Sequence, residues 1–304
     1  MNIGVVGGNG FLGKNLIKKL VVNDQNLLIL FQRSKPFLNL DIHDNVKIIY
    51  ESDLDNFRDE NFSIDILYYL ASDSIPVSSW NDPILEIEKN IAPFIKYVQF
   101  SVNHGLKKII YTSSAGTIYG ASKKNITEKK ILKPHSPYGI TKATIEYYME
   151  YFRKLHGVNF DVFRISNVYG PGQDTSKGLG LINTLLGSYF SKSSCKIYGD
   201  GKNIRNYIFV DDVVKVLLLT LTSNHKRSGI YNLCSDENHS INEIISLIEV
   251  SLNIKLTIDY LPKRKSDNPF IRLSNKKIKI KYPTLSFTSL EQGIQDTFKF
   301  LHTN

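Results

Sequence analysis

Short apolar runs alternate with helical patterns through the first half of the chain. Each run has the length and the β-branched content of a strand, and polar or turn-forming residues separate it from the next pattern. The runs are Asn2–Val6, Leu27–Phe31, Val46–Ile49, Ile64–Leu70, Lys108–Thr112 and Asp161–Ile165. Strands that alternate with helices build a parallel sheet covered by those helices. The pattern therefore predicts an α/β fold with a Rossmann-type, doubly wound parallel sheet.

The helical patterns between these runs place one apolar stripe against the sheet. Leu12, Leu16 and Leu20 recur every four residues and so lie on one face of the first helix. A longer pattern covers 84–102 and ends before Gly105, and a third covers 138–152. We expect one continuous helix in each stretch.

The composition changes after Asn167. The turn at 169–172 carries two glycines and a proline, and further glycines follow at 178 and 180. We predict a first domain at 1–167, to which segments near 205–230 return, and a smaller lobe at 168–304. The elements expected in this lobe are helices at 181–190, from 211, at 241–252 and at 289–301, with strands near 197, at 207–210 and at 255–260.

The composition is that of an ordinary globular protein. Of 304 residues, 42% are hydrophobic and 22% are charged, which excludes a disordered or fibrous chain. Cys195 and Cys234 form neither a disulfide framework nor a CxxC pair, so we expect a reducing compartment and no metal site. No apolar run is long enough to cross a bilayer, and no leader precedes the first strand. A soluble, cytoplasmic protein without a membrane partner is the expectation.

The net charge of +9 does not by itself indicate nucleic acid. The lysines are scattered, and the densest cluster, at 275–281, alternates with isoleucine as a half-exposed element does. No nucleic-acid-binding motif accompanies it, so we expect no such partner. A positive balance also suits ligands rich in phosphate.

A glycine-rich turn joins the first strand to the first helix. Gly7, Gly10 and Gly13 have the spacing Gly-x-x-Gly-x-x-Gly. Glycine permits a tight turn and lets backbone amides approach a pyrophosphate at the positive end of a helix. In this position the turn predicts dinucleotide binding.

The end of the second strand bears on the choice between NAD and NADP. A carboxylate there binds the ribose of NAD, whereas an arginine accommodates the phosphate of NADP. Here the residues are Gln32, Arg33 and Ser34, so both NAD and NADP stay open. Asp53, after the third strand, is a candidate partner for the adenine amino group.

Tyr138 and Lys142 form the most informative pair. Residues four apart share one face of a helix, so the phenol and the ammonium stand side by side. A nearby cation lowers the pKa of a tyrosine and makes it a usable proton acceptor or donor. Upstream, the hydroxyl-rich stretch 111–120 follows a strand directly, where side chains face the ligand crevice of a parallel sheet.

These pieces occur in the order of the extended short-chain dehydrogenase/reductase family. The chain resembles its nucleotide-sugar branch, the UDP-glucose 4-epimerases and their relatives, over essentially its whole length. The matching motifs are GGNGFLG, Asp53-Leu54, Tyr69-Leu70-Ala71, SSAGTIYG, YGITK, SNVYGPGQ, the run from Tyr198-Gly199-Asp200-Gly201 to Arg205 and Asp212, the Arg264…Asp267 pair and 287–293.

The resemblance implies a role for each matching position. Tyr138 would exchange a proton with the sugar, and Lys142 would lower its pKa and bind the nicotinamide ribose. The cofactor would lie against Gly7, Gly10, Phe11, Leu12, Gly13, Gln32, Arg33, Ser34, Asp53, Leu54, Leu70, Ala71 and Lys142. Residues 1–167 would thus be the dinucleotide-binding domain, and 168–304 mainly the substrate-binding lobe.

The same resemblance implies the substrate contacts and the assembly. Asn167, Arg205 and Arg264 would hold the diphosphate of the sugar nucleotide, a task to which the guanidinium fork is suited. Asp267 would lie near the nucleotide ribose. The helices around 84–102 and 138–152 would form the interface of a homodimer. A place in polysaccharide biosynthesis is the expected context.

Three positions depart from the family pattern. The third catalytic hydroxyl is usually found where this chain has Ala115, so Ser114 or Thr117 would replace it. The acid after the second strand is absent, which leaves the cofactor open. Asn206 stands where the family often has aspartate.

We predict an enzyme, and three functions compete. The first is 4-epimerisation of a nucleotide-linked hexose by transient oxidation at C4. The alternative is an NADPH-dependent reductase of a nucleotide-linked 4-keto-6-deoxyhexose, which the residues after the second strand favour. A cofactor-sensing regulator on the same fold is disfavoured, because such proteins usually lack the active tyrosine and this chain has both Tyr138 and Lys142.

Overall fold

The computed structural model describes residues 1–22, 26–33, 44–76, 78–175, 180–222, 227–263 and 270–303. The chain forms two compact units, each assembled from three separate stretches. Unit 1 comprises Met1–Ile118, Ser136–Phe163 and Leu217–Ile230, and unit 2 comprises Tyr119–His135, Arg164–Val216 and Tyr231–Asn304.

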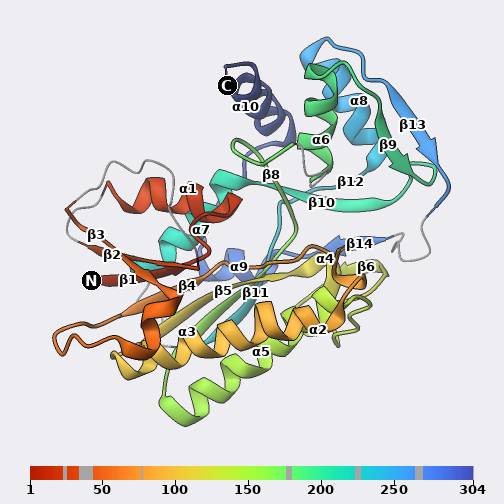
Figure 1. Cartoon of the computed structure of the whole chain (residues 1–304). Helices are drawn as coiled ribbons and strands as arrows, with labels where there is room; N and C mark the ends of the chain where they lie inside the picture. The colour runs from red at the N-terminus through yellow and green to blue at the C-terminus, as the bar shows by residue number, and fades with distance from the viewer. Residues whose placement is uncertain are drawn as a thin grey trace. The chain divides into compact units, whose positions relative to one another are not determined.

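A seven-stranded sheet forms the centre of unit 1 (Figure 1). Its strands are β1 (Asn2–Val6), β2 (Leu27–Gln32), β3 (Val46–Tyr50), β4 (Ile66–Tyr69), β5 (Lys108–Ser114), β7 (Asn159–Ile165) and β11 (Gly229–Leu233). Their order is β11-β7-β5-β4-β1-β2-β3, and the pairs β1–β2, β1–β4, β2–β3 and β4–β5 are parallel. The predicted α/β class is confirmed. The order reverses between β1 and β4, where doubly wound sheets bind their ligands.

Helices cover both faces of this sheet. They are α1 (Phe11–Leu20), η1 (Glu51–Asn56), η2 (Ser78–Trp80), α2 (Pro83–Glu86), η3 (Ile87–Ile91), α3 (Ala92–Asn103), α4 (Ala115–Ile118), α5 (Pro137–His156) and the end of α7 (Val210–Thr222). In Figure 1, α1 lies on one face and α3 and α5 on the other. The core between sheet and helices is rich in aromatic rings, among them Phe31, Tyr97, Phe94 and Phe152.

The helix expected at 84–102 is interrupted, which corrects the sequence prediction. Residues Ile87–Ile91 form a π-helical turn between α2 and α3. Pro93 lacks the amide hydrogen that would bond to the carbonyl of Lys89 in a regular α-helix. That carbonyl instead accepts a hydrogen bond of 2.7 Å from the guanidinium of Arg33. The spacing of apolar residues alone does not reveal that this carbonyl accepts its hydrogen bond from a side chain and not from a helical amide.

Unit 2 is built from short strands and several helices, and it also contains the start of α7. Its strands are β6 (Ser122–Ile126), β8 (Asn167–Tyr169), β9 (Cys195–Tyr198), β10 (Ile204–Phe209), β12 (Asn238–Ser240), β13 (Ile258–Leu261) and β14 (Ile271–Leu273), and its helices are α6 (Leu181–Phe190), α8 (Ile241–Leu252), α9 (Lys276–Lys281) and α10 (Leu290–Thr303). β12, β10 and β8 form one sheet, while β13 pairs with β9 and β14 with β6. Apolar residues of α6, α8 and α10 pack over these strands.

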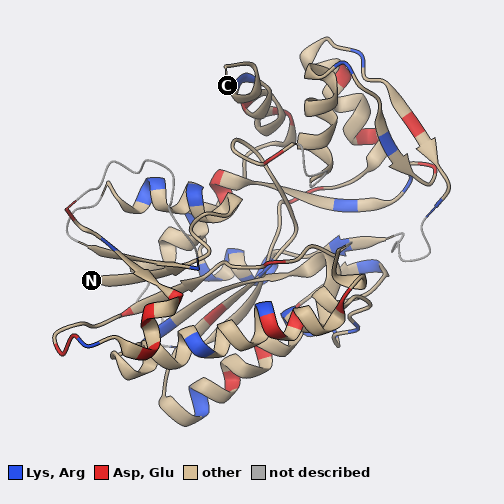
Figure 2. Ribbon diagram, viewed as in Figure 1, with Lys and Arg blue, Asp and Glu red and all other residues tan. Residues whose placement is uncertain are grey.

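Charged residues are spread over many elements rather than gathered on one. Blue and red segments are scattered among the other residues of the ribbon in Figure 2. The lysine cluster at 275–281 forms α9, where Lys279 pairs with Asp236. Among the described residues, no helix combines the length and the apolar character needed to cross a membrane.

Candidate active site

The glycine turn between β1 and α1 brings three backbone segments into contact. Gly7 has φ +87°, and a Cβ atom there would lie 2.5 Å from the amide nitrogen of Ala71. A Cβ atom on Gly13 would lie 2.2 Å from the carbonyl oxygen of Gly7. Both positions therefore require glycine. At Gly10, by contrast, a Cβ atom would meet only the Gly7 oxygen, at 3.3 Å, so a small shift of one neighbour would accommodate it.

The N-terminus of α1 is prepared for an anion. Its first turn carries no acidic residue, and Gly10 provides no side chain to cap it. Free amide groups and the positive end of the helix dipole attract phosphate at such a terminus.

A cleft of about 440 Å³ opens at this turn, within unit 1. It lies at the carboxyl ends of β1, β2 and β4, and its lining includes Gly7, Gly10, Phe11, Leu12, Gly13, Gln32, Arg33, Leu70, Ala71, Ser72, Asp73 and Tyr138. Nine of the predicted cofactor positions and the predicted catalytic tyrosine thus share one cavity.

Two further predicted cofactor positions lie outside this cleft. Asp53 and Leu54 belong to η1, where Leu54 packs into the core and the exposed Asp53 accepts a hydrogen bond from Ser52. Neither lines this cleft. Ser34 falls outside the described residues.

Arg33 is held by acidic groups from two other segments. Its Nε lies 2.9 Å from Glu51, its Nη1 contacts Asp73, and its Nη2 donates to the carbonyl of Lys89. Neither Glu51 nor Asp73 was predicted. Asp73 could have been found, because it follows the end of β4 beside the switch point of the sheet.

Gln32 lies beside Arg33 at the end of β2. Its side chain is 4% exposed, and within the described chain neither amide atom has a hydrogen-bond partner. A buried polar group without a partner costs about 1–3 kcal/mol. An amide that lines the cleft unpaired is suited to a ligand that supplies both a donor and an acceptor, as a ribose diol does.

The start of α5 positions Tyr138 and Lys142. Ser136 caps the helix by accepting a hydrogen bond from the amide of Gly139, and Pro137 occupies the first helical position. The Lys142 Nζ lies 5.5 Å from the centre of the Tyr138 ring and donates to the carbonyl oxygen of Thr112 at 3.2 Å. The side-by-side arrangement expected from the spacing is present.

Burial dominates the proton affinities of this pair. It raises the pKa of Tyr138 to about 12, although hydrogen bonds from Ser72 and Ser114 act to lower it. Burial also lowers the pKa of Lys142 to about 8, against the opposing effect of Glu86 and Glu146. In the protein without a ligand, the pKa of Tyr138 is therefore raised and not lowered as the sequence predicted. The reason is that desolvation of the phenolate outweighs the favourable contacts.

Ser114 is the predicted hydroxyl that faces Tyr138. Its side chain acts to lower the pKa of the Tyr138 phenol, whereas the Thr117 hydroxyl donates to the carbonyl oxygen of Ser114 at 3.5 Å. Ala115 is fully buried at the start of α4. Ser72, which the sequence did not single out, supplies a second hydroxyl from the loop after β4.

In unit 2, Asn167 and Arg205 lie on the paired strands β8 and β10. Asn167 donates from its side chain to the backbone carbonyl of Asn206 at 2.8 Å. The half-buried Arg205 donates to the carbonyl of Ile204. Arg264 and Asp267 lie outside the described residues.

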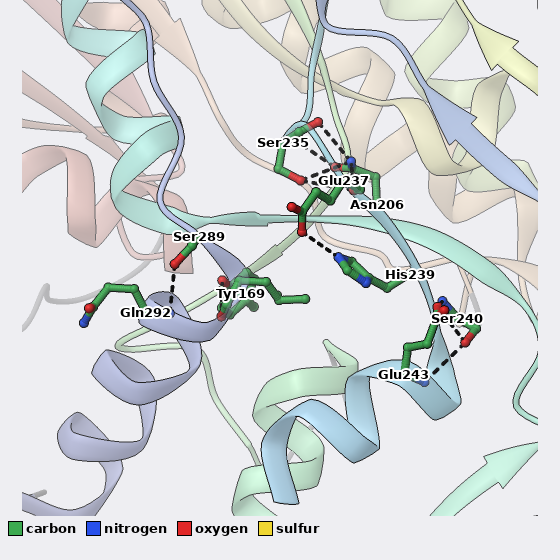
Figure 3. A network of polar contacts seen from close by, with 10 residues as sticks. Tyr169, Asn206, Ser235, Glu237, His239, Ser240, Glu243, Ser289 and Gln292 are labelled. Carbon is green, nitrogen blue, oxygen red and sulfur yellow. Dashed lines mark hydrogen bonds and ion pairs between the residues drawn. The ribbon is translucent and has the colours of Figure 1, made fainter. Parts of the chain in front are cut away.

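Asn206 is the centre of a hydrogen-bond network in unit 2 (Figure 3). Its Nδ2 lies 3.1 Å from both oxygens of Ser235 and 2.6 Å from the carbonyl of Glu237, and its Oδ1 accepts from the amide of Ser235. An aspartate could not donate to these carbonyls at neutral pH. The network therefore explains why asparagine occupies this position.

Further polar contacts follow in and around β12. Glu237 pairs with His239 at 3.0 Å, and Ser240 and Glu243 form a capping box at the start of α8 (Figure 3). Asn206 thus connects β10, which carries Arg205, to the loop between β11 and β12.

Comparison with known proteins agrees with this geometry. Residues 3–234 match the model of the NAD dependent epimerase/dehydratase family. A UDP-glucose 4-epimerase of Mycolicibacterium smegmatis is 26% identical, with 97% of each chain covered. A dTDP-4-dehydro-6-deoxyglucose reductase of Escherichia coli is 27% identical, with 84% of this chain and 83% of that protein covered.

A solved structure is similar over the entire chain. The UDP-glucose 4-epimerase of Thermotoga maritima, determined with UDP-glucose, superposes with a TM-score of 0.88 at 27% identity. The alignment covers 100% of this chain and 99% of that one.

Proposed function

The chain belongs to the NAD dependent epimerase/dehydratase family, and from this premise we propose that it is a 4-epimerase of a UDP-linked hexose. One observation carries the proposal. Tyr138 lines the same cleft as the glycine turn, and the ammonium of Lys142 is buried beside its ring. A proton-transferring group thus adjoins a dinucleotide site, as reversible oxidation of an alcohol requires.

In this proposal the residues of the chain move a proton, and a nicotinamide cofactor held at the glycine turn would supply the hydride acceptor and donor for C4. Tyr138 takes the proton from the C4 hydroxyl as the carbonyl forms, and it gives the proton back as the carbonyl is reduced on its other face. Ser114 and Ser72 favour the Tyr138 phenolate, and each would donate a hydrogen bond to it during the reaction. The positive charge of Lys142 stabilises the Tyr138 phenolate and so offsets part of the free energy that its burial costs.

Several features support NAD as the cofactor. The glycines at 7 and 13 allow the backbone of the turn to pack closely, Gly10 leaves room for a ligand beside it, and the unpaired amide of Gln32 suits a ribose. Arg33 faces two carboxylates, Glu51 and Asp73, so the net local charge is negative. A negative site repels the additional phosphate of NADP.

Asn167 and Arg205 are proposed to bind the diphosphate of the substrate, with Arg264 and Asp267 completing the set. The support for Asn167 and Arg205 is their place on neighbouring strands of unit 2, one with an exposed amide and the other with a guanidinium. The likeness to proteins that act on UDP-sugars supports the substrate class.

We further propose that the protein is a cytoplasmic homodimer. Large apolar side chains are exposed along α2 and α5, including Ile84 at 66% and Tyr147 at 72%. On α5, Ile140, Tyr147 and Tyr151 are spaced as one helical stripe. A contiguous apolar face of this kind is typical of a protein interface. Two buried cysteines without a disulfide support a reducing compartment.

A 4-ketoreductase is the second candidate, favoured by the similarity to the reductase of Escherichia coli. The two functions differ in how they use the cofactor. An epimerase must retain the reduced cofactor between its half-reactions, whereas a reductase releases it and takes up a new molecule.

Denaturing extraction followed by mass spectrometry, combined with a sugar-nucleotide assay, tests the proposal. We expect near-stoichiometric NAD and interconversion of UDP-glucose with UDP-galactose, or of their N-acetyl forms. Tyr138→Phe should lower kcat by about 10²–10⁴-fold while NAD stays bound, because only the proton transfer is lost. If none of these sugars is interconverted and NADPH is consumed with a 4-keto-6-deoxy sugar nucleotide, the enzyme is the reductase.

A further inference from the structure

The guanidinium of Arg33 is engaged at all three of its nitrogens. Its Nε lies 2.9 Å from Glu51 Oε2, its Nη1 contacts Asp73 Oδ2, and its Nη2 donates to the carbonyl oxygen of Lys89 at 2.7 Å. These partners belong to three separate segments, namely η1, the loop after β4 and the π-helical turn. We call Arg33, Glu51 and Asp73 the carboxylate clamp.

Each acid of the carboxylate clamp is also fixed from a second side. Glu51 Oε2 accepts a hydrogen bond of 2.9 Å from the hydroxyl of Tyr97, whose side chain is buried in α3. The backbone amide of Asp73 donates to Oδ1 of the buried Asn90 at 2.9 Å. Exposed ion pairs are usually weak because ordering two mobile side chains costs entropy. Here both acids are already ordered, so they lose little freedom when they pair with Arg33.

The carboxylate clamp lies where a dinucleotide-binding fold distinguishes NAD from NADP. In doubly wound folds an acid at the end of the second strand binds the adenosine ribose of NAD, and an arginine there accommodates the additional phosphate of NADP. This chain has Gln32 and Arg33 at that point, and both line the cleft. By residue type alone, the site would therefore admit the phosphate of NADP.

The two acids keep Arg33 from that role. Together with the guanidinium they carry one net negative charge, whereas a phosphate is bound by positive groups. A phosphate could pair with the Arg33 nitrogens only by displacing Glu51 or Asp73. Asp73 lines the cleft, but Glu51 is absent from the described residues that line it. Glu51 therefore acts on a bound cofactor chiefly through Arg33.

We propose that Glu51 determines the cofactor specificity, as a positioning residue that selects NAD by holding Arg33 away from the ribose phosphate of NADP. The inference rests on the proposed function in one respect, which is that the cleft binds a nicotinamide cofactor. It assigns to Glu51, which follows β3, the task that an acid at the end of the second strand performs in other doubly wound folds. One uncharged substitution should thus open the site to NADP.

Calorimetric titration with NAD and with NADP, on the full chain freed of bound nucleotide with charcoal, tests the proposal. We expect the wild type to bind NAD at least about tenfold more tightly than NADP. In Glu51→Gln the affinity for NADP should rise by at least about tenfold, because a donor and a positive charge become available at Arg33. The affinity for NAD should change by less than about threefold. Glutamine keeps an oxygen that can accept from Tyr97, so η1 should stay in place.

Two further variants separate the effect on Arg33 from a general change of charge. Asp55 lies on the same η1 and pairs with Lys96 at 2.8 Å, so Asp55→Asn removes the same charge and breaks a different ion pair. It should leave the affinity for NADP unchanged. Combining Glu51→Gln with Arg33→Gln should abolish the gain in NADP affinity, because the released guanidinium is the group that binds the phosphate.

Asp73→Asn provides an independent measurement that does not depend on the folding of Glu51→Gln. It releases Nη1 of Arg33 and removes a negative charge from the lining of the cleft. The affinity for NADP should again rise by at least about tenfold. In both single variants the gain should shrink as the salt concentration is raised, since salt screens the attraction between guanidinium and phosphate.

Three results would overturn the inference. They are equal affinities of the wild type for NAD and NADP, an NADP affinity in Glu51→Gln no higher than in Asp55→Asn, and a gain that persists without Arg33. Binding needs no turnover, so each of these results is distinct from a failed epimerase assay. A chain that binds neither nucleotide would overturn the proposed function together with the inference.

Discussion

Asn206 shows how one side chain can decide the local structure of unit 2. Its amide donates to carbonyls of the loop after β11 and accepts an amide hydrogen in return. In Asn206→Asp we expect a loss of about 1–3 kcal/mol in the free energy of unfolding at neutral pH, because a carboxylate would face carbonyl oxygens. Urea denaturation measures the loss.

The sign of its pH dependence follows from the same contacts. Carbonyl neighbours disfavour the charged form, so the folded chain would raise the pKa of an aspartate at 206. The destabilisation should therefore shrink as the pH falls through that pKa. Asn125→Asp, an exposed change of the same kind on β6, is the control. Equal losses in both variants would show that the network contributes nothing.

At the scale of single residues, the sequence predicts a functional role only where the spacing to nearby residues in the chain determines the geometry. Tyr138, Lys142 and the glycines at 7 and 13 were found because spacing alone sets their geometry. Glu51 was not, because its contact with Arg33 depends on how η1 meets the end of β2, and the two residues are 18 positions apart in the chain. Local patterns contain no information about such a contact.

At the scale of elements, different glycines of the turn between β1 and α1 are expected to serve stability and cofactor binding. Gly13→Ala forces a Cβ atom against the backbone of Gly7 and Gly8 and should cost about 1–3 kcal/mol of stability, or more. Gly10→Ala meets only one contact and should change stability by less than about 1 kcal/mol. It should still weaken NAD binding by at least about tenfold, because the new methyl group would occupy the space in which we propose that the pyrophosphate binds.

Calorimetric titration with NAD and thermal unfolding of both variants check this prediction. Gly116→Ala, where a Cβ atom would meet nothing within 4 Å, is the control for stability. Unchanged NAD affinity in Gly10→Ala would contradict the assignment of the cleft to the cofactor.

The strands of unit 1 could be predicted well, and those of unit 2 less so. β1 has the expected bounds, because its residues form a continuous apolar run. β6 has the sequence Ser-Lys-Lys-Asn-Ile, and β12 and β14 have three residues each, so no period can identify them. Their pairing partners, rather than their own side chains, make them strands.

At the scale of the whole molecule, the apolar face of α2 and α5 predicts association with a second copy. The double change Tyr147→Glu and Tyr151→Glu places two charges on this face and should convert a homodimer into a monomer in light scattering. Val250→Glu, at an exposed apolar residue of α8, should leave the dimer intact. A wild-type chain that is already monomeric would refute the proposal.

The interleaving of the two units has a consequence for how the chain is made. Unit 1 consists of three stretches, and the last of them ends at Ile230 of 304 residues. During synthesis a ribosome must therefore complete about three quarters of the chain before the first unit has all its parts, by which time two of the three stretches of unit 2 have already emerged. Domains usually fold in turn as they leave the ribosome. In this protein neither unit can complete its folding early in translation. The nascent chain must therefore avoid aggregation until most of it has been synthesised.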